Sequence, residues 1–173
     1  MIKTIFSVGS FLLISLSSPG QNFGFESQGP PDNSSFPQFD YATIDGDSVS
    51  SKDLADKIVI VNIWFVGCSG CKQEEPYLRK VTELYQNDED IVFLGFCMTK
   101  PERIKRYLKK NGEIGYKNIS LGREEVKEKY GVVLSPTHFL IKNGVLMGKL
   151  TAPIIPELKT LDWFEDEIRK LKN

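Results

Sequence analysis

Hydrophobic residues recur in distinct patterns along the chain, and each pattern predicts a different element of structure. From Phe36 to Lys57, apolar and polar residues alternate on both sides of Asp45-Gly46, which is typical of a β-hairpin with a tight turn. The segments Ile58–Phe65 and Ile91–Met98 are almost continuous runs of β-branched and aromatic residues. Such runs indicate strands that are buried on both faces, as in the centre of an α/β sheet.

Amphipathic helices are predicted between and after these strands. Apolar residues recur at steps of three and four from Tyr77 to Tyr85, and Pro101 suits the first turn of a helix that reaches about Lys110. The order of elements predicts a mixed α/β fold: a hairpin, a β-α-β-α unit, a second hairpin and a final helix. The other expected elements are a weaker strand near Lys117–Leu121, a short helix near Glu124–Tyr130, hairpin strands at Thr137–Lys142 and Val145–Leu150 around Asn143-Gly144, and a last helix over about Pro156–Leu171.

The N-terminal part of the chain differs in composition from the rest. Residues 1–20 combine Lys3, an apolar stretch over Ile5–Leu16 and small residues at plausible cleavage positions, a pattern typical of a secretory signal peptide. The apolar stretch is shorter than the roughly 20 residues that a membrane-spanning helix needs. Residues 21–35 are rich in Gly, Pro, Ser, Asn and Gln, and we expect a flexible leader there.

We therefore expect cleavage near Gly20-Gln21, a periplasmic or secreted location, and one ordered domain over residues 36–173. The alternative is an N-terminal helix that anchors in the membrane or belongs to the fold.

Charge and composition exclude several classes of function. The 173 residues carry 22 basic and 23 acidic side chains, for a formal net charge of −1. This balance gives no overall attraction to nucleic acid or to an anionic membrane, and we expect no nucleic-acid partner. With three cysteines and one histidine, the chain can build neither a disulfide-dense scaffold nor a zinc-finger cluster. We expect no metal ion and no cofactor.

The candidate chemistry lies where the first buried strand ends. The motif Cys68-Ser69-Gly70-Cys71 follows that strand and begins the helix, so two thiols three residues apart share one face and can form a disulfide. At a helix N-terminus, unpaired backbone N–H groups and the macrodipole favour the thiolate, which is the reactive form. We therefore expect Cys68 to attack a substrate disulfide and Cys71 to resolve the mixed disulfide.

Other interpretations of the two cysteines are half of a zinc or copper site and a structural disulfide. A four-ligand zinc site needs two more donors, and only Cys97 and His138 are available among soft ligands. Cys97 lies in a predicted buried strand, where an unpaired cysteine usually acts as a small hydrophobic residue. His138 is expected to be a surface or hydrogen-bonded strand residue rather than a ligand.

The segment Ile58–Pro76 resembles the active-site region of thioredoxin-fold proteins, and the wider pattern resembles the exported TlpA/ResA group of bacterial thiol–disulfide oxidoreductases. Further features of the resemblance are the hairpin before the first central strand, the helix proline Pro76, and Ser135-Pro136-Thr137 ahead of a strand and an Asn-Gly hairpin. The resemblance covers Phe36 to Asn173. It implies a thioredoxin-like fold, with a central mixed β-sheet flanked by helices and an N-terminal β-hairpin extension.

The resemblance also implies roles for residues outside the motif. The proline that matches Pro136 is cis in thioredoxin-like proteins, packs beside the sulfurs and keeps the preceding residue, here Ser135, open for pairing with an extended substrate. A glutamate that matches Glu74 lies close to the cysteines in the ResA-like group and is thought to manage protons. Asn62 stands where many thioredoxins have a buried aspartate; because asparagine cannot titrate, a proton-transfer role for Glu74 is favoured. Glu75 is expected to point elsewhere, and the alternative for Glu74 is a solvated helix residue.

Two departures from the family pattern concern the surroundings of the sulfurs. Gly67 stands where thioredoxins usually have a tryptophan, so a flat contact surface is missing beside Cys68. Ser69-Gly70 replaces the more usual Gly-Pro or Glu-Pro, and this flexible dipeptide changes how strongly the thiolate is held. We expect Gly67, Ser135 and Pro136 to contact the substrate.

These observations predict an exported thiol–disulfide oxidoreductase that reduces protein disulfides, is a monomer and, as the resemblance implies, receives electrons from a membrane thiol relay. One alternative is a carrier that binds copper(I) through Cys68 and Cys71, with His138 as a further candidate ligand, although C-x-x-x-C spacing is more typical of copper proteins of this fold. Another is a peroxidase of the peroxiredoxin group, although no P-x-x-x-T-x-x-C-like loop precedes Cys68.

Overall fold

The computed structural model describes residues 26–173, so the expected signal peptide and its cleavage site lie outside the described residues. None of the helices within residues 26–173 is long and apolar enough to cross a membrane. The elements are β1 (Asp40–Ala42), β2 (Ser48–Ser50), β3 (Ile58–Trp64), α1 (Ser69–Leu84), β4 (Ile91–Cys97), α2 (Pro101–Asn111), β5 (Lys117–Ser120), α3 (Arg123–Tyr130), β6 (Thr137–Lys142), β7 (Val145–Leu150), a 3-10 helix η1 (Pro156–Leu158) and α4 (Thr160–Lys172).

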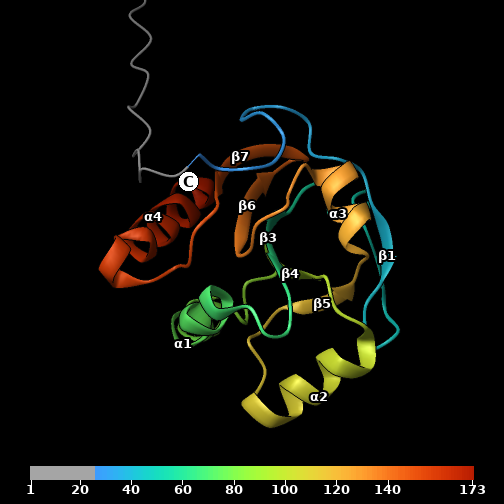
Figure 1. The fold of residues 1–173 in the computed structure, drawn as a ribbon. Helices are drawn as coiled ribbons and strands as arrows, with labels where there is room; N and C mark the ends of the chain where they lie inside the picture. Colours follow the sequence, from blue (N-terminus) through green and yellow to red (C-terminus); the bar gives the residue numbers. More distant parts are fainter. Residues whose placement is uncertain (1–25) are drawn as a thin grey trace, which may run out of the picture.

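A five-stranded sheet with the order β5-β4-β3-β6-β7 forms the centre of the fold (Figure 1). β3 pairs in parallel with β4, which pairs in parallel with β5. On its other side β3 pairs antiparallel with β6, and β7 pairs antiparallel with β6. β1 and β2 form a separate antiparallel pair. The mixed central sheet and the N-terminal hairpin predicted from the sequence are both confirmed.

The central strand explains the long apolar run in the sequence. Every residue of β3 is buried, because it has a neighbouring strand on each side and packed layers over both faces. On one face, Ile60 belongs to a core cluster with residues of α1, α2 and α4. On the other, Val61 belongs to a cluster with residues of α3 and of the N-terminal hairpin. Figure 1 shows α1 and α4 on one side of the sheet and α3 and β1 on the other.

The two predicted hairpins have different turns. Asn143 and Gly144 both have positive φ, 53° and 73°, as a two-residue turn of the predicted type requires. In the first hairpin only Gly46 has positive φ, and the loop is longer, closed by the Thr43 N–H donating to the Asp47 carbonyl at 2.8 Å. The Thr43 hydroxyl also accepts from the Asp47 N–H at 3.2 Å. The first hairpin was therefore predicted correctly, but its two-residue turn was not, because a threonine side chain stabilises a wider loop.

The last helix is interrupted, which the sequence pattern did not indicate. Lys159 adopts a left-handed conformation with φ 57°, so η1 ends before it and α4 begins at Thr160. The Thr160 hydroxyl donates to the Pro153 carbonyl at 2.6 Å and accepts from the Ile155 N–H at 2.9 Å. These bonds hold the chain in a tight bend before α4, and apolar periodicity carries no information about such a bend.

The described part of the expected leader runs along β7. The Asn33 N–H donates to the Leu146 carbonyl at 2.8 Å. The Gln28 side-chain oxygen accepts from the backbone N–H groups of Val133 and Leu134 at 2.7 and 3.2 Å. This part is therefore held against the domain, whereas composition alone suggested a flexible segment.

Cys97 is the free cysteine of the described residues and lies on β4 with no exposed surface. Burial raises the pKa of its thiol from 9.0 to about 12. Cys97 therefore stays protonated at neutral pH, as expected for a cysteine that acts as a hydrophobic core residue.

Labelling with iodoacetamide at about pH 8 tests this arrangement. In the oxidised native protein we expect no labelled cysteine, because Cys68 and Cys71 are joined and Cys97 is buried and protonated. After denaturation one cysteine should be labelled, and after denaturation with reduction all three cysteines of the chain should be labelled. Intact-mass spectrometry counts the labels. Rapid labelling of Cys97 in the native protein would contradict the structure.

Candidate active site

Cys68 and Cys71 form a disulfide at the junction of β3 and α1, with Cα atoms 5.3 Å apart. Cys68 is the N-cap of α1, and its Sγ accepts a hydrogen bond from the Cys71 N–H at 3.1 Å. Only 6% of Cys68 and 5% of Cys71 is exposed. In the reduced protein, this N–H and the positive end of the helix dipole favour negative charge on the Cys68 sulfur.

The loop before β6 lies against the disulfide. The Ser135–Pro136 peptide bond is cis, as expected, and the Ser135 carbonyl oxygen lies 3.6 Å from the Cys68 Sγ. A Cβ atom on Gly70 would lie 3.0 Å from Cδ of Pro136 and 3.1 Å from Cγ of Pro153. Glycine between the two cysteines therefore allows two prolines to pack closely against the first turn of α1. Pro153 was not among the residues singled out from the sequence.

The turn before the motif also depends on glycine. Gly67 has φ 106°, a conformation that residues with a Cβ rarely adopt, although no atom lies within 4 Å of the position that a Cβ would occupy. The backbone conformation, rather than lack of space, therefore requires glycine at this position. Trp64, at the end of β3, is buried, and its Nε1–H donates to the Asn118 side chain at 3.2 Å, so Trp64 is a core residue.

Glu74 is fully buried one helical turn after Cys71. Its Oε2 accepts from the Ile154 N–H at 2.9 Å and lies 2.9 Å from His138 Nε2. Its Oε1 accepts from the Asn62 side-chain amide at 3.2 Å. The carboxyl group therefore points into the protein, and the alternative of a solvated helix residue is wrong.

His138 is the main site residue that sequence reasoning did not assign. It is buried and hydrogen-bonded on β6, one of the two outcomes expected for it, but its partner is Glu74. The register of β3 and β6 places it directly opposite Asn62. Asn62 is the residue that stands where many thioredoxins have a buried aspartate. Strand register could therefore have linked His138 to Glu74, had the pairing been known.

His138 lies with Glu74 rather than with the cysteine pair. Within residues 26–173, no group of three or more Cys, His, Asp and Glu side chains is placed to hold a metal ion. His138, the further candidate ligand for copper(I), is hydrogen-bonded to Glu74 in this structure.

Glu75 points away from the sulfurs, as expected. It accepts a hydrogen bond from the Tyr107 hydroxyl of α2, and its Oε2 lies 3.6 Å from Arg79. Burial, and then the hydrogen bond to Glu75, raise the pKa of Tyr107, so this hydroxyl remains a donor at neutral pH. Two adjacent glutamates thus face different layers of the protein.

The chain is similar to a known family and to several known proteins. A family model described as AhpC/TSA matches residues 33–148. The thiol-disulfide oxidoreductase ResA of Bacillus thuringiensis subsp. konkukian is 29% identical over 136 residues, which cover 78% of this chain and 75% of that protein. The thioredoxin-like protein YneN of Bacillus subtilis is 24% identical over 148 residues, covering 82% of this chain and 86% of that protein.

Among solved structures, the thioredoxin domain of a thiol-disulfide oxidoreductase from Bacteroides vulgatus is 26% identical and superposes with a TM-score of 0.64, covering 78% of this chain and 98% of that one. The chain therefore belongs to the AhpC/TSA family and is a thioredoxin-fold thiol–disulfide oxidoreductase of the ResA type.

Proposed function

We propose that this protein is exported and reduces disulfide bonds of other proteins, with Cys68 as the nucleophile and Cys71 as the resolving cysteine. The observation that carries the assignment of roles is the 3.1 Å hydrogen bond from the Cys71 N–H to the Cys68 Sγ at the start of α1. This N–H stabilises charge on Cys68, whereas the sulfur of Cys71 lies inside the first turn.

The exchange reaction proceeds in two balanced steps. The Cys68 thiolate attacks one sulfur of the substrate disulfide, forms a mixed disulfide and releases the other substrate sulfur as a thiolate, which takes up a proton. The Cys71 thiol then loses its proton and attacks the Cys68 Sγ. This step forms the Cys68–Cys71 disulfide and releases the second substrate thiol, so that two electrons pass from the protein to the substrate.

The loop before β6 offers a place for the substrate chain. Among the residues that the structure describes, none accepts a hydrogen bond from the Ser135 N–H, and the Ser135 carbonyl lies beside Cys68. An extended substrate segment can pair with this backbone, as the family resemblance implies, and Pro136 and Gly67 are expected to contact it as well.

Glu74 is proposed to accept the proton of Cys71 in the second step and to return it later. It lies one turn from Cys71 on the same helix, and its carboxylate is held by Ile154, Asn62 and His138. The other titratable group that interacts with it is Tyr116, whose pKa is raised by burial and then by the charge of Glu74, so that Tyr116 stays neutral. Proton transfer by a positioned carboxylate suits the resolving step.

Substitution of the resolving cysteine tests the assignment of roles. With Cys71→Ser we expect stable mixed disulfides between Cys68 and substrate proteins, because nothing then attacks the Cys68 Sγ. Non-reducing gels and mass spectrometry identify the adducts. The matched variant Cys68→Ser should trap no comparable set, and equal trapping by both variants would contradict the proposed order of attack. Peroxide consumption by the reduced protein would instead favour the peroxidase alternative.

Substitution of Glu74 tests the proton transfer. In Glu74→Gln we expect the resolving step to slow by about 100-fold near neutral pH and its pH profile to lose one ionisation, because an amide cannot accept the proton. Stopped-flow measurement of the reduction of a disulfide substrate across the pH range from about 5 to 9 gives both results.

The neighbouring variant Glu75→Gln is the control. It changes the same side chain one position along α1, where the carboxylate contacts Tyr107 and Arg79. We expect its pH profile to match that of the wild-type protein. An unchanged profile in Glu74→Gln would show that Glu74 has a structural role only.

Export rests on the signal-like pattern of residues 1–20. In an oxidising compartment a dithiol needs a supply of electrons, so we propose a membrane thiol relay as the donor. N-terminal sequencing of the protein from the exported fraction should begin near Gln21. A mature protein that begins at Met1 in that fraction would contradict the signal peptide.

A further inference from the structure

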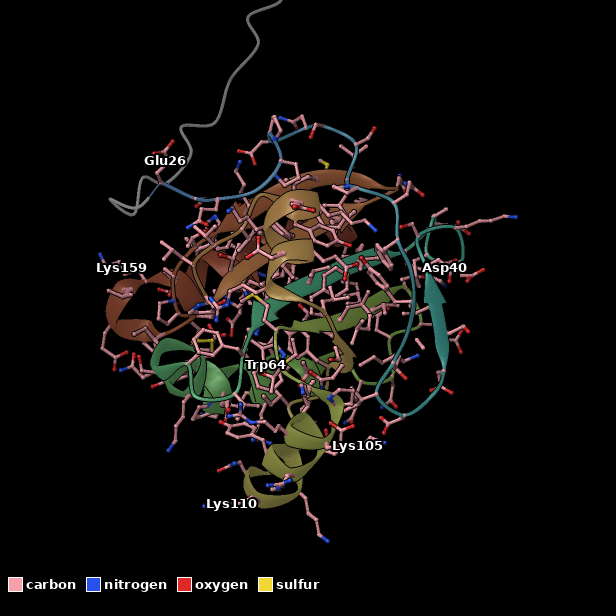
Figure 2. All side chains as sticks on the ribbon, turned by 45° about the vertical axis from the view of Figure 1, so that its right-hand side comes forward. Glu26, Asp40, Trp64, Lys105, Lys110 and Lys159 are labelled. Atoms are coloured by element: carbon pink, nitrogen blue, oxygen red, sulfur yellow. A yellow bond between two sulfur atoms is a disulfide. The ribbon has the colours of Figure 1, made fainter. Side chains whose placement is uncertain are left out.

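The basic residues of α2 divide between two sides of the helix. Lys105, Arg106, Lys109 and Lys110 form a run that is most simply explained as a solvated face, and Arg103 adds a fifth basic residue. Because successive residues are rotated by about 100°, the three residues Arg103, Arg106 and Lys110 share one side and the other two share another. Figure 2 labels one residue of each side, Lys105 and Lys110.

The first side borders a hollow of about 300 Å³ between α2 and the start of α1. Four cations line this hollow, together with Val66 and Tyr107: Lys72, Arg103, Arg106 and Lys110. All four are exposed, and within residues 26–173 none of them forms an ion pair. No acidic side chain belongs to the lining. The nearby Glu75 is buried and already bonded to Tyr107 and Arg79.

The second side of α2 differs in its charge balance. Lys105 and Lys109 line another hollow together with Asp45 and Glu113, so both signs are present. Lys105 lies 3.6 Å from Asp45. The concentration of unpaired positive charge is therefore a property of the first hollow and not of α2 as a whole. The formal net charge of the whole chain is −1.

The lining of the hollow includes close sequence neighbours of the active-site residues. Val66 immediately precedes Gly67, and Lys72 immediately follows Cys71. Tyr107 contacts Trp64, the last residue of β3, with ring centroids 5.9 Å apart. Lining residues of the hollow thus connect it to the strand and helix that carry the two cysteines.

We propose that this hollow, defined by Lys72, Arg103, Arg106 and Lys110, binds a carboxylate-rich segment of the protein whose disulfide reacts with Cys68. The proposal rests on the proposed function and adds a class of substrate to it. Arginine guanidinium groups bind carboxylates through paired hydrogen bonds, which suits them to an acidic peptide.

The spacing of the cations favours a peptide segment over a single small anion. Arg103 and Lys110 are seven positions apart on α2, which corresponds to about 10 Å along a helix axis. An extended peptide covers that distance with about three residues. Alternate acidic side chains of such a segment can face the row of cations while its cysteine approaches Cys68.

The hollow acts on docking rather than on the exchange chemistry. Complementary charge raises the rate of productive encounter and weakens with added salt. An uncharged small disulfide makes no use of the hollow, so its reduction measures the cysteine pair alone.

Cyclic peptides with one disulfide test the proposal, in three versions whose cysteines are flanked by glutamates, glutamines or lysines. We expect the reduced wild-type protein to reduce the glutamate peptide about tenfold faster than the glutamine peptide at low ionic strength. The lysine peptide should be slowest, and the differences should shrink as salt is added. The triple variant Arg103→Gln, Arg106→Gln, Lys110→Gln should lose the preference and keep its rate with hydroxyethyl disulfide.

The double variant Lys105→Gln, Lys109→Gln is the matched control, because it removes positive charge from the other side of the same helix. It should keep the preference. A preference that survives in the triple variant, or that falls equally in the control, would overturn the proposal.

A second measurement separates this proposal from the proposed function. If the wild-type protein reduces none of the peptides and does not reduce hydroxyethyl disulfide, the reductase function fails. Fluorescence anisotropy then measures binding of a fluorescein-labelled glutamate peptide that has no cysteines. This measurement tests the hollow as a binding site independently of the exchange chemistry. Binding that weakens at least tenfold in the triple variant, and not in the control, supports the site; equal binding by all three proteins rejects it.

Discussion

One buried carboxylate joins the parts of the structure on which the active site depends. Glu74 projects from α1 and takes hydrogen bonds from β3, β6 and the segment before α4, through Asn62, His138 and Ile154. A carboxyl group with no exposed surface is costly to bury unless such partners surround it. The arrangement therefore fixes where α1 lies on the sheet, and with it the position of the Cys68–Cys71 pair relative to the cis-proline loop on β6.

The segment before α4 contacts both the buried Glu74 and the turn that carries the cysteine pair. Its Ile154 N–H binds Glu74, and the preceding residue, Pro153, packs against the position of Gly70 between the two cysteines. The bend at Thr160 holds the same segment in place through the Pro153 carbonyl. The break in the last helix therefore has a structural consequence at the active site.

The sequence alone predicted the features that depend on local pattern. The buried strands β3 and β4, the cysteine pair at a helix start and the Asn143-Gly144 turn follow from apolar runs, helix-end electrostatics and the φ angles that each residue tolerates. It did not predict the wider loop at Gly46, the break at Lys159 or the bond between Glu74 and His138. The first two depend on single threonine hydroxyl groups, and the third depends on the register between strands far apart in the chain. Periodicity within one segment carries no information about such partners.

The low exposure of both sulfurs explains why the surface around them matters for substrate choice. With 6% of Cys68 and 5% of Cys71 exposed, a substrate disulfide reaches the pair only when the substrate chain lies closely against the protein. No atom lies within 4 Å of the position that a Cβ on Gly67 would occupy, and the Ser135 carbonyl lies 3.6 Å from the Cys68 Sγ. Neither feature distinguishes one peptide sequence from another, because backbone pairing and open space accept most side chains. In the proposed docking of an acidic segment, charge on the neighbouring α2 surface supplies this discrimination, because the chain as a whole is almost neutral.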